Sequence, residues 1–96
     1  MSKHKNIKST LRKLTTLTVY HAEKIISTEH QLEKEIVPLL KNSSTKSEIY
    51  KEILAKAKEL NILATASVMQ SMHTKLATSI QIESLQRDLV ALGEEL

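Results

Sequence analysis

The stretch "IKSTLRKLTTLTVYHAEKIISTEHQLEKEIVPLL", residues 7–40, decides the expected fold, because its seam positions recur in alternating steps of three and four. Such spacing lays one stripe along a helix. The stripe consists of Ile7, Leu11, Leu14, Thr18, His21, Ile25, Thr28, Leu32, Ile36 and Leu39. We therefore expect one long amphipathic helix over residues 4–40, with Pro38 kinking or stopping its last turn.

The polar members of this stripe are candidate interface residues. A polar group at a packed position disfavours wrong alignments, so it helps to set register and partner choice. We expect Thr18, His21 and Thr28 to face inward and to act in this way.

A second helix is expected over residues 45–77. In the polar segment "KNSSTKSE", residues 41–48, Thr45 and Glu48 have the spacing of a capping box, which satisfies amides of a first helical turn. A connection of about four residues makes the two helices antiparallel neighbours, a long hairpin.

The apolar pattern changes direction after residue 60. Ala64, Val68, Met72, Leu76 and Ile80 recur at every fourth position, so their stripe drifts by about 40° per step. The direction is then restored in a heptad that we regard as a further candidate interface, formed by Ile82, Leu85, Leu89 and Leu92.

One straight helix cannot bury both parts of this pattern on one side. We predict a break near Thr78 and Ser79, where Thr78 and Gln81 have capping-box spacing, and a third helix over residues 80–95. Met69 and Met72 are predicted to fill gaps in the core.

The composition fits helices and one domain. The 96 residues include no Phe, no Trp, one Gly and one Pro, so strand and turn formers are scarce. With 41% hydrophobic and 26% charged residues, the chain is in the globular range. The prediction is an all-α, antiparallel helical bundle of three to four helices in a single domain over residues 1–96.

The sequence predicts no catalytic, cofactor-binding or metal site, and a non-enzymatic protein. Cysteine is absent, and His21 and His30 are nine residues apart, half a turn out of phase on a helix, so they cannot share an ion. His73 in "SMHTKLATS" resembles the phosphoacceptor of histidine phosphotransfer domains, but Leu76 and Ala77 stand where that family has Lys and Gly.

Charge is uneven along the chain, whose net charge is +3. The first part is basic and the last part acidic, through Lys3, Lys5, Lys8, Arg12 and Lys13 against Glu83, Asp88, Glu94 and Glu95. The two ends would attract each other across a bundle. The alternative is that the basic N-terminal turns contact nucleic acid, although they lack the interleaved aromatics of single-strand binders.

No apolar run approaches the roughly 18 residues of a membrane span, and no apolar segment follows the basic start, so we expect a cytoplasmic protein. This expectation is compatible with a membrane protein as the partner.

Three segments resemble the immunity proteins for pediocin-like bacteriocins. They are "AEKIIS" at 22–27, "SEIYKEILAKAKEL" at 47–60 and "SIQIESLQRDLVAL" at 79–92, the last with Ile80, Ile82, Ser84, Gln86 and Leu89 near the places of a pattern that opens the family's last helix. The resemblance implies an antiparallel four-helix bundle in the cytoplasm of a producer cell, acting at the sugar-transporter receptor of the bacteriocin.

Three functions follow as expectations. The first is a helical interaction module that self-associates as a homo-oligomer or docks with partner helices in a hetero-complex. The second is bacteriocin immunity, and the third is a small protein that binds nucleic acid through its basic N-terminus.

Overall fold

The computed structural model describes residues 3–41 and 46–96, and in these residues the chain forms four α-helices and no strand. The helices are α1 (Lys3–Thr16), α2 (Ala22–Ile36), α3 (Ser47–Ser67) and α4 (Met72–Glu94). Two short 3₁₀ helices, η1 (Val19–His21) and η2 (Val37–Lys41), stand before and after α2. The all-α prediction is confirmed.

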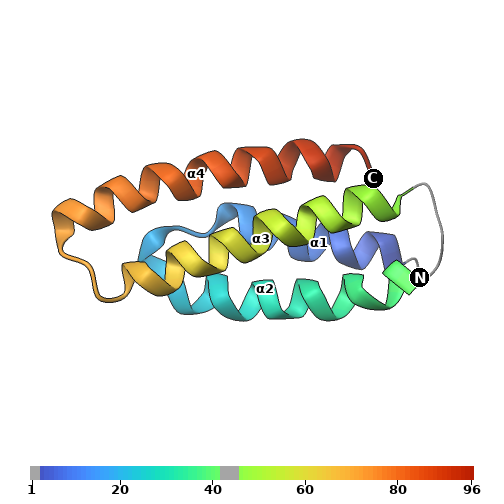
Figure 1. Ribbon diagram of the computed structural model, residues 1–96, viewed down its shortest axis with the longest axis horizontal. Helices are drawn as coiled ribbons and strands as arrows, with labels where there is room; N and C mark the ends of the chain where they lie inside the picture. Colours follow the sequence, from blue (N-terminus) through green and yellow to red (C-terminus); the bar gives the residue numbers. More distant parts are fainter. Residues whose placement is uncertain (1–2, 42–45) are drawn as a thin grey trace.

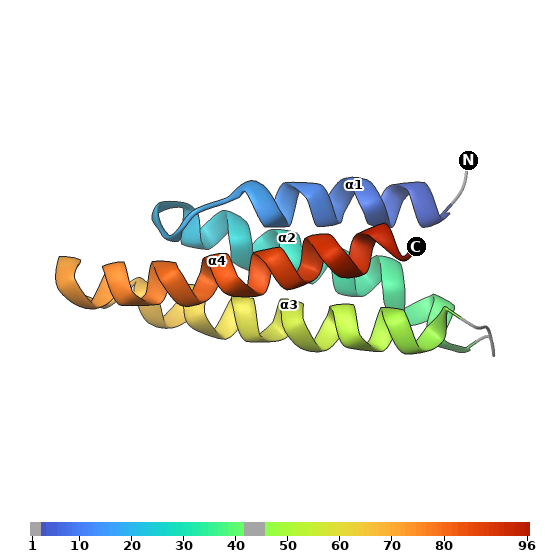
Figure 2. The same cartoon turned by 90° about the horizontal axis from the view of Figure 1, so that it is seen from above.

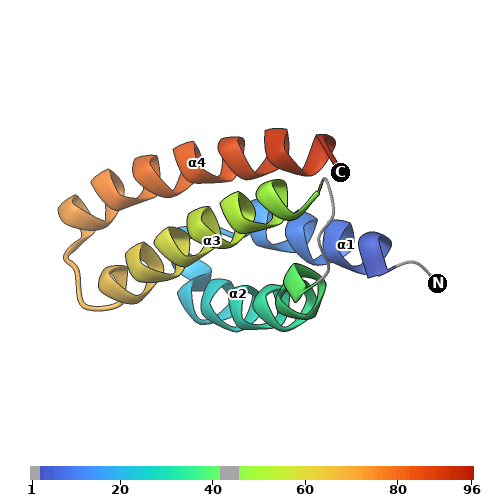
Figure 3. The ribbon, with the colours of Figure 1, turned by 45° about the vertical axis from the view of Figure 1, so that its right-hand side comes forward.

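Successive helices run in opposite directions, so that each is antiparallel to the next (Figure 1). Contacts join α1 to α2, α2 to α3, α3 to α4 and α4 back to α1, which closes a four-helix ring. Figure 3 shows α4 and α2 on opposite sides of α3. The result is a rod measuring 44 × 20 × 19 Å.

The predicted single helix over residues 4–40 is wrong, because it breaks between Thr16 and Val19. Four β-branched residues lie within residues 15–19, and such residues lose rotamer freedom in a helix. The hydroxyls of Thr15 and Thr16 donate to the carbonyls of Arg12 and Lys13. Thr18 then adopts an extended conformation (φ −117°, ψ 173°) and its side chain accepts a hydrogen bond from the Tyr20 amide.

The predicted break near Thr78 and Ser79 is also wrong. The chain turns at residues 68–71 instead, and α4 begins at Met72 and passes through Thr78 without interruption. Ser71 is the N-cap, since its hydroxyl accepts from the Thr74 amide. Thr78 donates to the Gln70 side chain at 2.7 Å and so ties the turn to the helix.

Two further predictions concern helix ends. Thr45 lies outside the described residues, as does the capping box that it would form with Glu48, and α3 begins at Ser47. As expected from Pro38, α2 ends just before the proline, at Ile36, and the chain continues as the 3₁₀ helix η2.

The core is formed by one inward face of each helix. Its largest fully buried apolar side chains are Ile7, Leu14, Ile25, Leu32, Ile36, Ile53, Leu60, Ile82 and Leu89. On α3, Ala57 and Ala64 are fully buried, and their small side chains let neighbouring helices approach closely. Gly93 serves the same purpose on α4, because a Cβ there would lie 2.9 Å from Leu11 Cδ2.

Candidate functional site

The predicted C-terminal interface lies inside the chain. The four residues of this heptad are all buried in the core, where they pack against the other helices of the same chain. They are Ile82, Leu85, Leu89 and Leu92. These side chains are not presented to a partner.

The predicted polar seam of the N-terminal half is wrong by one residue. Thr18 and His21 are exposed, and Thr28 is partly buried. The break after Thr16 moves the first two inward positions to Val19 and Ala22, whereas Ile25, Leu32 and Ile36 lie inward as expected and Glu29 lies inward in place of Thr28. Thr18 and His21 instead contact each other, with 3.3 Å between Thr18 Oγ1 and His21 Nδ1.

The residue that does occupy the seam is Glu29, whose side chain is 2% exposed. Spacing alone could not distinguish it from Thr28, because both positions are compatible with Ile25 and Leu32 at steps of three and four. The predicted seam contains Thr28, and the structure places Glu29 inward instead.

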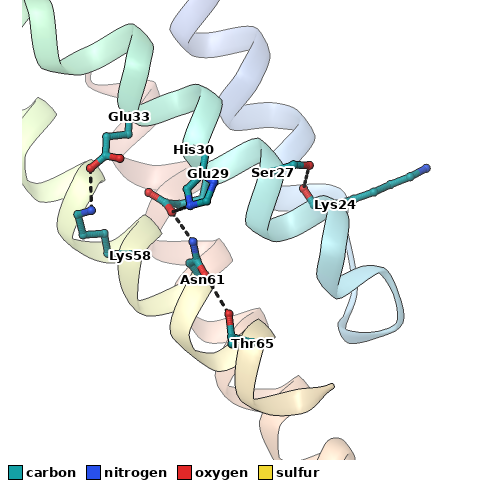
Figure 4. A network of polar contacts seen from close by, with 8 residues as sticks. All are labelled: Lys24, Ser27, Glu29, His30, Glu33, Lys58, Asn61 and Thr65. Carbon is teal, nitrogen blue, oxygen red and sulfur yellow. Dashed lines mark hydrogen bonds and ion pairs between the residues drawn. The ribbon is translucent and has the colours of Figure 1, made fainter. Parts of the chain in front are cut away.

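Glu29 belongs to a polar network between α2 and α3 (Figure 4). Thr65 Oγ1 donates to Asn61 Oδ1, and Asn61 Nδ2 donates to Glu29 Oε1. The exposed His30 brings its Nε2 to 4.0 Å from the same carboxylate oxygen. One oxygen, Glu29 Oε2, has no hydrogen-bond partner in the described structure.

An ion pair joins the same two helices one turn away from this network. Lys58 Nζ donates to Glu33 Oε2 at 2.7 Å. This hydrogen bond and the charge of Lys58 lower the pKa of Glu33, and the hydrogen bond and charge of Glu33 raise the pKa of Lys58. The whole cluster packs two helices of one chain together, which indicates a structural role.

The described residues contain no group of three or more His, Asp or Glu side chains placed to hold a metal ion. None of the helices in the described ranges has the length and apolar run needed to cross a bilayer.

The start of α1 and the end of α4 lie at the same end of the rod, because the four helices alternate in direction (Figure 2). Lys8, Arg12 and Glu94 line one groove of about 290 Å³ between these helices. No ion pair joins them within 4.0 Å in the described part of the chain. Lys46 makes a direct link at this end, donating to the Glu95 carbonyl at 2.8 Å.

The surface that stands out is at the opposite end of the rod. There, the α3–α4 hairpin projects beyond α1 and α2 (Figures 1 and 2). Its large apolar side chains are between 54% and 89% exposed, and we call them the hairpin face: Ile62, Val68, Met69, Met72, Leu76 and Ile80. The prediction that Met69 and Met72 fill the core is therefore wrong.

The hairpin face follows from the phase of α4. At 100° per residue, the buried Ile82 and Leu89 point about 120–140° away from Leu76. Met72, Leu76 and Ile80 therefore form a second apolar stripe on the solvent side of a helix whose other side is already packed. The drift seen in the sequence is thus not resolved by a break, and α4 keeps two stripes.

A groove of about 400 Å³ runs beside this stripe between α3 and α4. Ile62 and Leu63 line it from α3, and Gln81 and Ser84 line it from α4. The apolar surface therefore extends from the stripe onto the neighbouring helix.

The charges around the hairpin face are also unusual. No carboxylate side chain occurs from residue 60 to residue 82, and Lys75 carries the one fixed charge of that segment. Glu59 and Glu83 mark its far edge on the two helices. The sequence indicated this surface, because the drifting stripe contains apolar residues that cannot all lie on one buried face of a helix.

Comparisons of the chain with protein-family models, with curated proteins and with solved structures give no match.

Proposed function

We propose that the chain is a cytoplasmic, non-enzymatic interaction module that binds another protein surface through the hairpin face. The observation that carries this proposal is the exposure of six large apolar side chains within nineteen residues of one hairpin. Surfaces of monomeric proteins rarely gather apolar groups in this way, and larger patches mark interaction sites.

The packing of the rest of the molecule supports the same proposal. The predicted heptad of α4 is buried within the chain, so the bundle completes its own core without using the hairpin face. Methionine adds to this, because its flexible side chain adapts to irregular partner surfaces, and Met69 and Met72 are the two most exposed side chains of the face.

Site-specific photocrosslinking tests the proposal. A photoreactive residue at position 76 is expected to give discrete protein adducts in the native host, and the substitution Ile80→Asp is expected to abolish them. A photoreactive residue at the exposed Lys13 of α1 is the matched control and should give none. The proposal fails if position 76 also yields no adduct.

A second candidate is immunity to a pediocin-like bacteriocin, acting at a membrane transporter. What supports it is the antiparallel order of four helices, which is the fold that the sequence resemblance implies. Expression in a sensitive bacterium should raise survival against at least one such peptide. Unchanged sensitivity to a panel of these peptides removes this candidate.

A further inference from the structure

We infer that the hairpin face contains a redox-sensitive modification site: hydrogen peroxide converts Met69 and Met72 to sulfoxides, which makes the face polar and releases its partner while the four-helix fold stays intact. The release of a partner rests on the proposed function, whereas the chemistry on the two side chains does not. The inference is carried by where the sulfur atoms lie in the molecule.

The sulfur atoms of the described residues are confined to the tip of the hairpin. The chain has no cysteine and three methionines, so Met69 and Met72 hold all the sulfur of the described ranges. Both residues lie where α3 turns into α4, at the end of the hairpin that projects beyond α1 and α2 (Figures 1 and 2). Met69 is 89% exposed and Met72 is 72% exposed, so a small oxidant in water can reach both side chains.

The oxidation needs no reactant besides the peroxide. A lone pair of the thioether sulfur attacks one peroxide oxygen, so that an S–O bond forms while the O–O bond breaks and hydroxide leaves. The hydroxide then takes the proton from the oxygen on sulfur, which yields the sulfoxide and one water. Each sulfur loses two electrons and each peroxide gains two. Because no side chain assists the reaction, exposure decides which sulfur reacts.

The fold does not depend on either thioether. None of the buried residues in the described ranges is a methionine, so the core gains no polar group on oxidation. Other groups hold the turn: Thr78 donates to the Gln70 side chain at 2.7 Å, and the Ser71 hydroxyl accepts from the Thr74 amide. Oxidation of a core methionine disrupts packing, whereas here the change is confined to the surface.

The apolar character of the hairpin face does depend on these two residues. They are two of its six members and the two most exposed of them. A sulfoxide is polar, so each oxidised residue forfeits the burial of one apolar side chain against a partner. That loss corresponds to about a tenfold or larger decrease in affinity.

Treatment of the purified chain with hydrogen peroxide tests the site without any partner. Peptide mapping by mass spectrometry should show a gain of about 16 Da on both Met69 and Met72, at rates within about threefold of that of free methionine. Retention on a hydrophobic interaction column should fall, because the face has lost apolar surface. The urea midpoint of unfolding should stay unchanged, because neither side chain is in the core.

Two matched double variants isolate the effect of the two sulfur atoms. Met69→Leu with Met72→Leu keeps the apolar character and nearly the same volume, so its column retention should equal that of the untreated wild type and should not respond to peroxide. This variant retains Met1, and it therefore reports any effect of oxidising that residue. Met69→Gln with Met72→Gln should elute with the oxidised wild type before any treatment.

Photocrosslinking from position 76 tests the release of the partner. The purified chain with a photoreactive residue at this position is oxidised, freed of peroxide and illuminated in an extract of the native host. Oxidation should lower the yield of protein adducts about tenfold or more, and it should leave the yield of the leucine double variant unchanged. Methionine sulfoxide reductases for both sulfoxide epimers should restore the original yield.

The inference is overturned if either methionine resists peroxide, if oxidation lowers the urea midpoint, or if column retention does not change. It is also overturned if the oxidised and untreated chains give equal yields of adducts, an outcome under which the proposed function stands. If the untreated chain gives no adduct, the proposed function fails, and the column retention still decides whether oxidation changes the polarity of the face.

Discussion

At the scale of single residues, Glu29 has the most unusual environment. It is a carboxylate at an inward position of α2, and Asn61 of α3 donates the hydrogen bond that compensates for its burial. Removing the donor of a buried acceptor lowers the stability of the fold by more than a satisfied hydrogen bond contributes. The reason is that the acceptor has already lost its hydrogen bonds to water on folding.

We therefore predict that Asn61→Ala lowers the free energy of unfolding by about 1–3 kcal/mol. The double variant Glu29→Leu with Asn61→Leu should recover much of the loss, since it removes both polar partners. Urea denaturation measures the three values. A change below about 0.5 kcal/mol for Asn61→Ala would contradict this account of Glu29.

The Lys58–Glu33 pair makes a prediction about pH. The pKa of Glu33 is lowered from its ordinary value of 4.5, so the pair stabilises the fold above pH 4.5 and this stability is lost as the pH falls through the lowered pKa. The pKa of Lys58 is raised from 10.5, so the stability is complete below pH 10.5 and is lost as the pH rises through the raised value.

A double-mutant cycle with Glu33→Gln and Lys58→Met isolates this pair from the other titrating groups. The coupling free energy is expected to be constant between pH 6 and pH 9 and to shrink below pH 4.5. Because both side chains are partly exposed, it should also shrink in high salt. Coupling that grows on acidification would contradict the assignment.

At the scale of the elements, Gln86 of α4 secures the end of α1. Its amide nitrogen donates to the Leu14 carbonyl at 3.1 Å and to the Leu17 carbonyl at 2.6 Å, where the helix has run out of amide partners. One buried side chain thereby fixes the point at which the chain leaves α1.

The substitution Gln86→Leu should destabilise the protein by about 1–3 kcal/mol, because it leaves these carbonyls without a donor. Gln81→Leu changes an exposed glutamine of the same helix and is the matched control, with an expected effect within about 0.5 kcal/mol. Thermal and urea unfolding supply both numbers. Equal effects of the two substitutions would show that Gln86 does not cap α1.

At the scale of the whole molecule, α4 has two apolar sides with different roles. The side that contains Leu89 completes the four-helix core, and the side that contains Leu76 faces solvent. Substitution of Leu89 should therefore affect stability, and substitution of Leu76 should affect association with a partner.

We expect Leu89→Ala to cost about 2–5 kcal/mol, the usual loss for a fully buried leucine. Leu76→Gln should change the free energy of unfolding by less than about 0.5 kcal/mol when measured at concentrations where the chain is monomeric. Denaturant titration of both variants gives the comparison. A large loss for Leu76→Gln would mean that Leu76 supports the fold.

The sequence by itself determined that this chain is helical, because periodicity and scarce Gly, Pro and aromatics act locally, within a turn or two. It also determined that α4 carries more apolar residues than one face can hold. Only the tertiary structure decided that the first helix breaks at Thr18, that Glu29 and not Thr28 lies inward, and that the hairpin turns at Ser71. Those outcomes depend on packing between helices distant in the sequence, where a shift of one residue rotates a side chain by 100° from the core toward water.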